Sequence, residues 1–184
     1  MRHERMLDAQ KAVLLIVDVQ ESFRKIIPDF SNMTRNISIL VEAAKILKVP
    51  VIVTEQYPQG LQKIVAEITA ILGDHQLFEK SCFSCCQLEG FMKGLEGLGR
   101  KQVMVTGIEA HVCVNQTAHD LLGAGYQVHL IMDAIASRFP KNQEVGVQKM
   151  LSSGAIPSST EVALFEMLRE SQTETFKAVQ RLIK

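Results

Sequence analysis

The amino-acid sequence predicts an α/β fold in which a mainly parallel sheet lies between two layers of helices. Short β-branched apolar runs of strand length alternate with longer stretches whose apolar residues recur at helical spacing. This alternation continues along the chain without a linker, a low-complexity tract or an internal repeat. A length of 184 residues suits one domain with a sizeable core. We therefore expect a single domain, residues 1–184, with a three-layer αβα, Rossmann-like architecture of about six strands.

The strands are expected where the apolar runs are continuous, because a strand of a parallel sheet is covered on both faces. The predicted strands are residues 12–17, 51–53, 77–78, 103–105, 128–132 and 155–156.

The helices are expected where the apolar spacing follows the helical period and ends at a breaker residue. The first, residues 37–47, has Ser31 or Asn32 as its expected N-cap and Pro50 beyond its end. A second, residues 64–72, is expected to end at Gly73. The other predicted helices are residues 91–98, 114–122, 145–151, 161–168 and 175–183.

Composition argues against several classes of partner. Lys plus Arg and Asp plus Glu are each 20, so no net field attracts nucleic acid or a membrane surface. No apolar run approaches the roughly 18 residues of a membrane span. The start MRHERMLDAQK lacks the apolar core of a signal peptide, and three of the four cysteines fall within residues 82–86. We therefore expect a cytoplasmic protein without a disulfide framework.

Three reactive side chains follow predicted strands. Asp18 comes directly after the first strand, Lys80 after Leu77 and Phe78, and Cys113 after the strand at 103–105. Each has an ordinary structural interpretation, as a turn-former, a surface charge or a packed thiol. In open α/β sheets, however, ligands bind outside the carboxyl ends of the strands. An acid, a lysine and a cysteine at one sheet edge are typical of nucleophilic catalysis.

Three motifs occur in the same order in a known family. The chain contains VDVQ (17–20), FEK followed by SxFS (78–84), and GIxxHVCV (107–114). With the stretches DAIASR (133–138) and STEVALFE, the chain resembles the isochorismatase-like cysteine hydrolases from about residue 13 to 165. The resemblance implies a catalytic triad of Asp18, Lys80 and Cys113, and a homo-oligomer, either a dimer or a larger ring.

The resemblance also implies an oxyanion hole and a cis peptide bond in the turn before Cys113. The oxyanion hole would use the backbone amide of Cys113 and one or two amides of the turn formed by Ile108, Glu109 and Ala110. The implied cis bond joins Ile108 and Glu109.

The chemistry of these residue types predicts a hydrolase of a small amide, ester or vinyl ether. A thiol attacks as its thiolate, so Asp18 is the expected base. Lys80 and the helix N-terminus at Cys113 are both expected to lower the pKa of the thiol. The reaction would proceed through a covalent or thiolate-assisted intermediate, on a small-molecule substrate, and without a cofactor, since no phosphate-binding glycine motif follows a strand.

Two departures from nicotinamidases point to a metal-free branch of the family. Residues 51–60 lack an Asp-x-His motif, and Ala110 replaces a threonine. We expect no metal. The candidate substrate-binding residues follow the first, second and fourth of the predicted strands: Gln20, Phe23, Glu55, Gln56, Tyr57 and His111.

Three alternatives remain open. Cys82 and Cys85 have the spacing of a zinc pair, with Cys86, His75 or Cys113 as further ligands. Cys113 and His111 could form a dyad. The chain could also be a non-catalytic interaction or redox-sensing protein that keeps the fold.

Overall fold

A computed structural model describes residues 2–184 as a six-stranded sheet whose strands all run parallel, in the order β3-β2-β1-β4-β5-β6. The strands are β1 Ala12–Val17, β2 Val51–Gln56, β3 His75–Lys80, β4 Gln102–Ile108, β5 Gln127–Ala136 and β6 Ile156–Ser158. This result confirms the predicted three-layer, Rossmann-like architecture.

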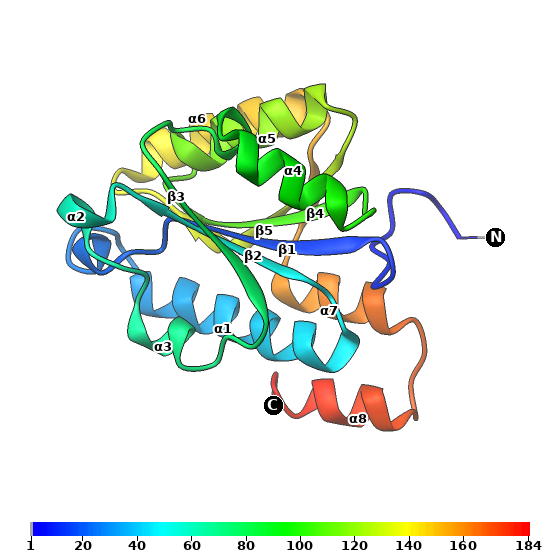
Figure 1. The fold of residues 1–184 in the computed structure, drawn as a ribbon. Coiled ribbons are helices and arrows are strands. Elements are labelled where there is room, and N and C mark those ends of the chain that lie inside the picture. Colours follow the sequence, from blue (N-terminus) through cyan, green and yellow to red (C-terminus); the bar gives the residue numbers. More distant parts are fainter. Residues whose placement is uncertain (1) are drawn as a thin grey trace.

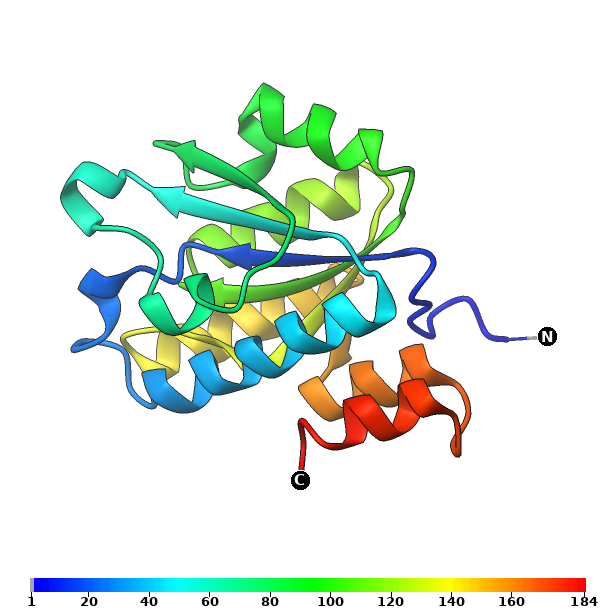
Figure 2. The same ribbon diagram turned by 60° about the horizontal axis from the view of Figure 1, so that its bottom comes forward.

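Helices cover both faces of the sheet (Figure 1). On one face lie α1 Phe30–Leu47, α3 Ala66–Thr69, α7 Thr160–Leu168 and α8 Glu174–Gln180. On the other lie α4 Glu89–Gly97, α5 Cys113–Gly123 and α6 Pro140–Ser152. The short helix α2, Pro58–Leu61, and the 3₁₀ turns Glu21–Phe23 and Cys85–Gln87 lie in loops. Figure 2 shows α8 beside α7, below the sheet. No helix among residues 2–184 has the length and apolar character to cross a membrane.

Strand β1 forms the centre of two apolar cores. Its six residues are buried without exception, and alternate side chains point to opposite faces. Leu14 and Ile16 join the core beneath α1 and α7. Val13, Leu15 and Val17 join the core beneath α4, α5 and α6. This double burial explains why the strand has a continuous apolar sequence.

The connections reverse direction between β1 and β4. From β1 the chain moves outward to β2 and β3, and then returns to β4 and moves outward on the other side to β5 and β6. Neighbouring loops therefore diverge at the carboxyl ends of β1 and β4, the usual position of a binding crevice in an open α/β sheet. Asp18 and the turn leading to Cys113 both lie at this point.

Two details of the predicted helices are wrong. The first helix begins at Phe30, and its N-cap is Asp29, in the left-handed conformation and without a capping side-chain bond, rather than Ser31 or Asn32. The helix expected over 64–72 shortens to α3, which ends at Thr69. Its start is held in an extended form, because Val65 donates its amide to Val19 and Ile64 pairs with Gln20.

Candidate active site

A buried ion pair joins the carboxyl ends of β1 and β3. Lys80 Nζ lies 2.6 Å from Asp18 Oδ2, and the two side chains are 0% and 2% exposed. Lys80 is the last residue of β3, and Asp18 follows the last residue of β1. Because β2 lies between these strands, the two side chains meet over its carboxyl end. Two charges withdrawn from water in this way need close partners for each remaining polar atom.

The Lys80 ammonium has three further acceptors. Gln56 Oε1 lies 2.7 Å from Nζ, and the carbonyl oxygens of Cys82 and Phe83 each lie 3.2 Å away. Burial by itself opposes the positive charge. The negative charge of Asp18 is the largest influence in the opposite direction, and on balance the pKa of Lys80 is raised. Lys80 is therefore a permanent cation at neutral pH.

Gln20 and Gln56 are held by hydrogen bonds within the protein. Gln20 donates its amide to the carbonyl oxygens of Gln56 and Gln62 at 3.0 and 2.6 Å, and accepts from the Gln56 amide at 2.8 Å. Gln56 in turn contacts Lys80 and donates to the Ser81 carbonyl at 2.8 Å. These contacts make Gln56 a positioning residue for Lys80, with Gln20 behind it.

Asp18 is fixed by both its backbone and its second carboxylate oxygen. Its φ of 52° lies in the left-handed region, which aspartate adopts more readily than most residues. Thr54 Oγ1 donates to Asp18 Oδ1 at 2.7 Å. Across the crevice, Gly107 has φ 103°, and a Cβ there would lie 2.0 Å from the carbonyl oxygen of Val17. Only glycine lets β4 approach the end of β1 so closely.

Cys113 is the first residue of α5 and is 7% exposed. Burial raises the pKa of its thiol above the ordinary range, and Asp18 raises it further through its charge and a side-chain hydrogen bond. Lys80 acts in the opposite direction but is the smaller influence. The expected lowering of the thiol pKa is therefore wrong. The resting group is a protonated thiol, and Asp18 is the neighbouring charge that most favours this state.

The turn before Cys113 offers backbone amides. The peptide bond between Ile108 and Glu109 is cis. Ala110 donates its amide to the Ala136 carbonyl at 2.9 Å, so this amide is already occupied, contrary to the role expected for it. Within residues 2–184, the amides of Glu109, His111 and Cys113 have no acceptor. These three amides are therefore free to donate to a bound group.

The structure separates the other predicted substrate-binding residues. Glu55 points to the opposite face of β2 from Thr54 and Gln56, because side chains alternate along a strand. Phe23 packs against the apolar core of the α1 face, which is not the core that contains Cys113. Tyr57 is 59% exposed, and its ring lies over Gly60 of α2. Glu55 therefore faces away from Cys113, and the contacts of Phe23 lie with the α1-face core.

His111 remains near Cys113 but has another partner. Its Nδ1 lies 2.9 Å from Ser137 Oγ, at the end of β5. The turn that carries it packs tightly against α6, where a Cβ on Gly146 would lie 2.8 Å from His111 Cα. This arrangement favours Asp18 over His111 as the partner of the thiol.

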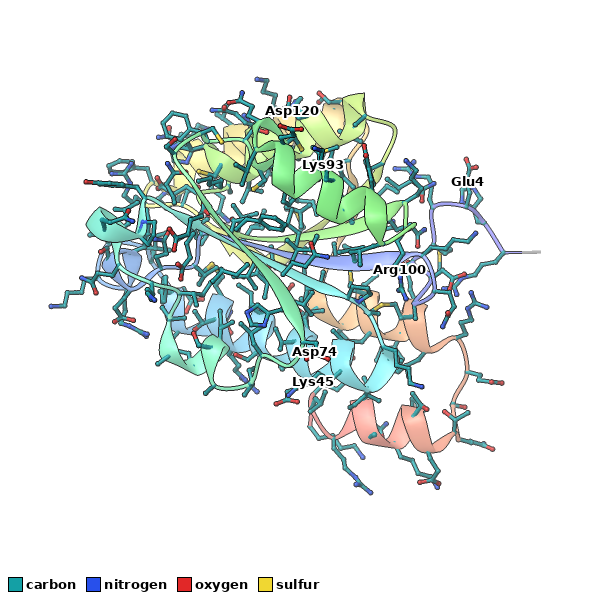
Figure 3. All side chains as sticks on the ribbon, viewed as in Figure 1. Glu4, Lys45, Asp74, Lys93, Arg100 and Asp120 are labelled. Atoms are coloured by element: carbon teal, nitrogen blue, oxygen red, sulfur yellow. The ribbon has the colours of Figure 1, made fainter. Side chains whose placement is uncertain are left out.

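The loop after β3 places a second thiol close to the site. Cys85 donates its amide to Thr117 Oγ1 at 3.0 Å, and its Sγ lies 3.8 Å from Thr54 Oγ1. Ser84 donates to Asp120 of α5 at 2.6 Å, which ties this loop to the helix (Asp120 is labelled in Figure 3). Burial raises the pKa of Cys85 to about 11. Among residues 2–184, no group of three or more His, Cys, Asp or Glu side chains has the arrangement of a metal site.

Sequence reasoning missed Thr54 and Arg138. Arg138 donates from its backbone amide and from Nε to Glu109 Oε1, at 3.0 and 2.9 Å, and so anchors the cis turn. Thr54 could have been predicted from the sequence. Side chains alternate along a strand, so Thr54 and Gln56 of β2 lie on one face and Glu55 on the other. Nothing in the sequence pairs Arg138 with Glu109, which lies 29 residues earlier.

Comparison with known proteins agrees with this fold. Residues 12–162 match the model of the isochorismatase domain. The chain is 36% identical to isochorismatase domain-containing protein 2 of Danio rerio, covering 96% of this chain and 89% of that one. It is 37% identical to the secreted isochorismatase effector Isc1 of Phytophthora sojae, covering 94% and 84%. Among solved structures, the MAR1 ribonuclease of Caenorhabditis elegans has a TM-score of 0.92 at 35% identity, covering 97% and 92%.

These matches and the sheet define an isochorismatase-type hydrolase fold. The chain belongs to the isochorismatase family. The resemblance first seen in VDVQ, FEK and GIxxHVCV is thereby confirmed.

Proposed function

We propose that this protein is a cysteine-dependent hydrolase of a small amide, ester or vinyl ether, in which Asp18, Lys80 and Cys113 form the catalytic triad. The observation that carries the proposal is the position of Asp18. Its carboxylate contacts the Lys80 ammonium at 2.6 Å and acts on the pKa of the Cys113 thiol, at the point where the connections of the sheet reverse. A buried carboxylate, a lysine and a thiol gathered at such a crevice are the components of covalent catalysis.

The raised pKa of Cys113 indicates how the triad works. Because the resting sulfur keeps its proton, Asp18 takes that proton as Sγ attacks the carbonyl carbon of an amide or ester substrate. The tetrahedral oxyanion is stabilised by free amides of the turn, those of Cys113 and either His111 or Glu109. When the carbon–nitrogen or carbon–oxygen bond breaks, Asp18 returns the proton to the leaving group. Water then attacks the thioester, Asp18 accepts its proton, and the sulfur leaves and is reprotonated.

Lys80 pairs with the negative charge of Asp18 beside the thiol. The ammonium also offsets the negative charge that develops on sulfur. Neither role requires contact with substrate, which agrees with the four protein acceptors that surround Nζ. Gln56 and Thr54 then hold the two partners at a fixed distance.

The balanced charge of the chain supports a small molecule over a nucleic acid as substrate. The C. elegans relative is described as a ribonuclease. Binding to a phosphate backbone relies on an excess of Lys and Arg, whereas this chain has 20 basic and 20 acidic residues. The homo-oligomeric state and the cytoplasmic location stay predictions, and one relative is a secreted effector.

The decisive experiment compares wild type with Cys113→Ala on a panel of small amides, esters and vinyl ethers. We expect turnover in the wild type and its loss in Cys113→Ala, with a mass increase on the Cys113 peptide when a slow acyl substrate is trapped. Cys86→Ala is the matched control, because this half-buried thiol lies outside the triad. Turnover that survives in Cys113→Ala would contradict the mechanism. Folded protein without turnover across the panel would favour the non-catalytic or redox-sensing alternative.

A further inference from the structure

A second pocket lies on the sheet face opposite Cys113. It has a volume of about 500 Å³ and is bounded by β2, β3 and the segment from Lys63 to Leu72. Because Thr54 and Gln56 point to the other face, the triad does not use this pocket. None of the chemistry described above involves it.

The pocket has a buried floor and an exposed rim. Val53 and Glu55 of β2 are buried and form the floor. The rim is formed by residues that are exposed or half-buried. Two of them, Lys63 and His75, are basic, and the others are mostly apolar or small: Ile64, Ala66, Thr69, Ala70, Leu72 and Leu77. An opening of this kind accepts an apolar group from solvent, and its inner end is a carboxylate.

The carboxylate of Glu55 is only half satisfied. The residue is 2% exposed, and its Oε1 accepts a hydrogen bond from the Ile64 amide at 2.7 Å. Within residues 2–184, Oε2 is buried and has no hydrogen-bond partner. Lys63 also lines the pocket, but no cation of the described chain lies within ion-pair distance of Glu55. A buried carboxylate oxygen without a hydrogen-bond donor is unfavourable in free energy. A ligand that donates to it therefore forms a stronger hydrogen bond than it would in water.

We propose that this pocket binds a small organic cation, a primary amine carried on an apolar ring or short alkyl chain. The ammonium would donate to Glu55 Oε2, and the apolar body would lie against Val53, Ile64 and Leu77. The chemistry discriminates against anions, because the floor is negative, and against neutral molecules of the same shape, because they leave the charge of Glu55 uncompensated.

The segment that closes the pocket is attached to the end of β1. Gln20 donates to the Gln62 carbonyl at 2.6 Å, and Val65 donates to the Val19 carbonyl at 3.1 Å. These bonds hold the rim in place independently of a ligand. The site is therefore largely preformed, which reduces the ordering cost of binding.

The test is a titration of the full chain with benzylamine, followed by amide NMR shifts, with benzyl alcohol as the matched neutral probe. We expect saturable shifts at Ile64, Ala66 and Leu77, and a dissociation constant at least about tenfold lower for the amine than for the alcohol. Equal affinity for the two probes, or amine shifts only elsewhere, would overturn the proposal.

Two variants make the assignment specific. Glu55→Gln keeps the volume and the acceptor for the Ile64 amide but removes the charge, so it should abolish the preference for the amine. Ala70→Phe adds bulk at the exposed rim and should weaken binding of both probes, which keeps the test decisive if Glu55→Gln does not fold. Unchanged amine binding in whichever variant folds would show that the amine binds elsewhere.

Discussion

Lys80 and Asp18 form an ion pair with a Nζ–Oδ2 distance of 2.6 Å and almost no solvent exposure. Lys80 ends β3 and Asp18 follows β1, so the ion pair connects two strands at the crevice. In the proposed mechanism it also positions the general base. Removal of one member leaves the other charged and buried.

We therefore expect Lys80→Met alone to lower the free energy of unfolding by about 3–5 kcal/mol. Asp18→Asn with Lys80→Met should cost less than the sum of the single changes, because no uncompensated charge remains. Urea unfolding of the four proteins measures this coupling. Lys141→Met is the control, since its ion pair with Glu144 is exposed and should contribute less than about 0.5 kcal/mol. Additive effects of the buried pair would show that its charges do not interact as the structure indicates.

Gln56 is expected to affect kcat rather than KM. Gln56→Met removes the acceptor 2.7 Å from Lys80 Nζ while keeping a side chain of similar length. A lost hydrogen bond to a charged group corresponds to about 1.5 kcal/mol, or roughly a tenfold fall in kcat. Steady-state kinetics on any substrate found by the panel would separate the two constants. A rise in KM alone would assign Gln56 to substrate binding, as the sequence first suggested.

The protonation of Cys113 can be read from alkylation. Burial and Asp18 raise the pKa of this thiol, so its reaction with iodoacetamide should keep accelerating with pH beyond about 8.5, where an ordinary thiol levels off. Asp18→Asn removes one of the influences that raise the pKa, and should speed alkylation of Cys113 at a fixed alkaline pH. Mass mapping distinguishes Cys113 from Cys82, Cys85 and Cys86. A plateau near the ordinary thiol value would mean that Lys80 dominates.

Because His129 is buried, we expect the folded protein to lose stability in acid. It is fully buried in β5, neither ring nitrogen has a partner among residues 2–184, and burial, with a smaller effect of Arg5, lowers its pKa to about 4. The unfolded chain binds a proton near pH 6.5 and the folded chain does not, so stability is complete above that pH and falls as pH drops toward 4. The expected loss between pH 7 and pH 5 is about 2 kcal/mol.

Chemical unfolding of wild type and His129→Leu at several pH values checks this expectation. Leucine does not titrate, so the variant should lose less stability over the same pH range. Parallel pH profiles for the two proteins would rule out His129 as the source.

Most of the sheet could be predicted because burial on both faces requires continuous apolar strands. All six strands were located from such runs, although every strand except β1 extends beyond its run, often into polar residues such as Thr54 and Gln56. The helix expected over 64–72 was wrong for a non-local reason. Backbone bonds to Val19 and Gln20 hold its beginning in an extended conformation. The local spacing of apolar residues gives no information about such contacts with distant parts of the chain.

The sequence by itself determined the fold class and the three residues of the proposed triad, because each follows an apolar strand and parallel strands end at one edge. Only the tertiary structure decided which side chains point toward that edge and which of the reactive groups are protonated there. It turned Glu55 to the opposite face and Phe23 into the other core. It also left the Cys113 thiol protonated, because burial and the nearby Asp18 carboxylate outweigh Lys80. The side to which a side chain points, and how far it is withdrawn from water, depend on contacts between strands that are distant in sequence. Only the folded chain determines these two properties.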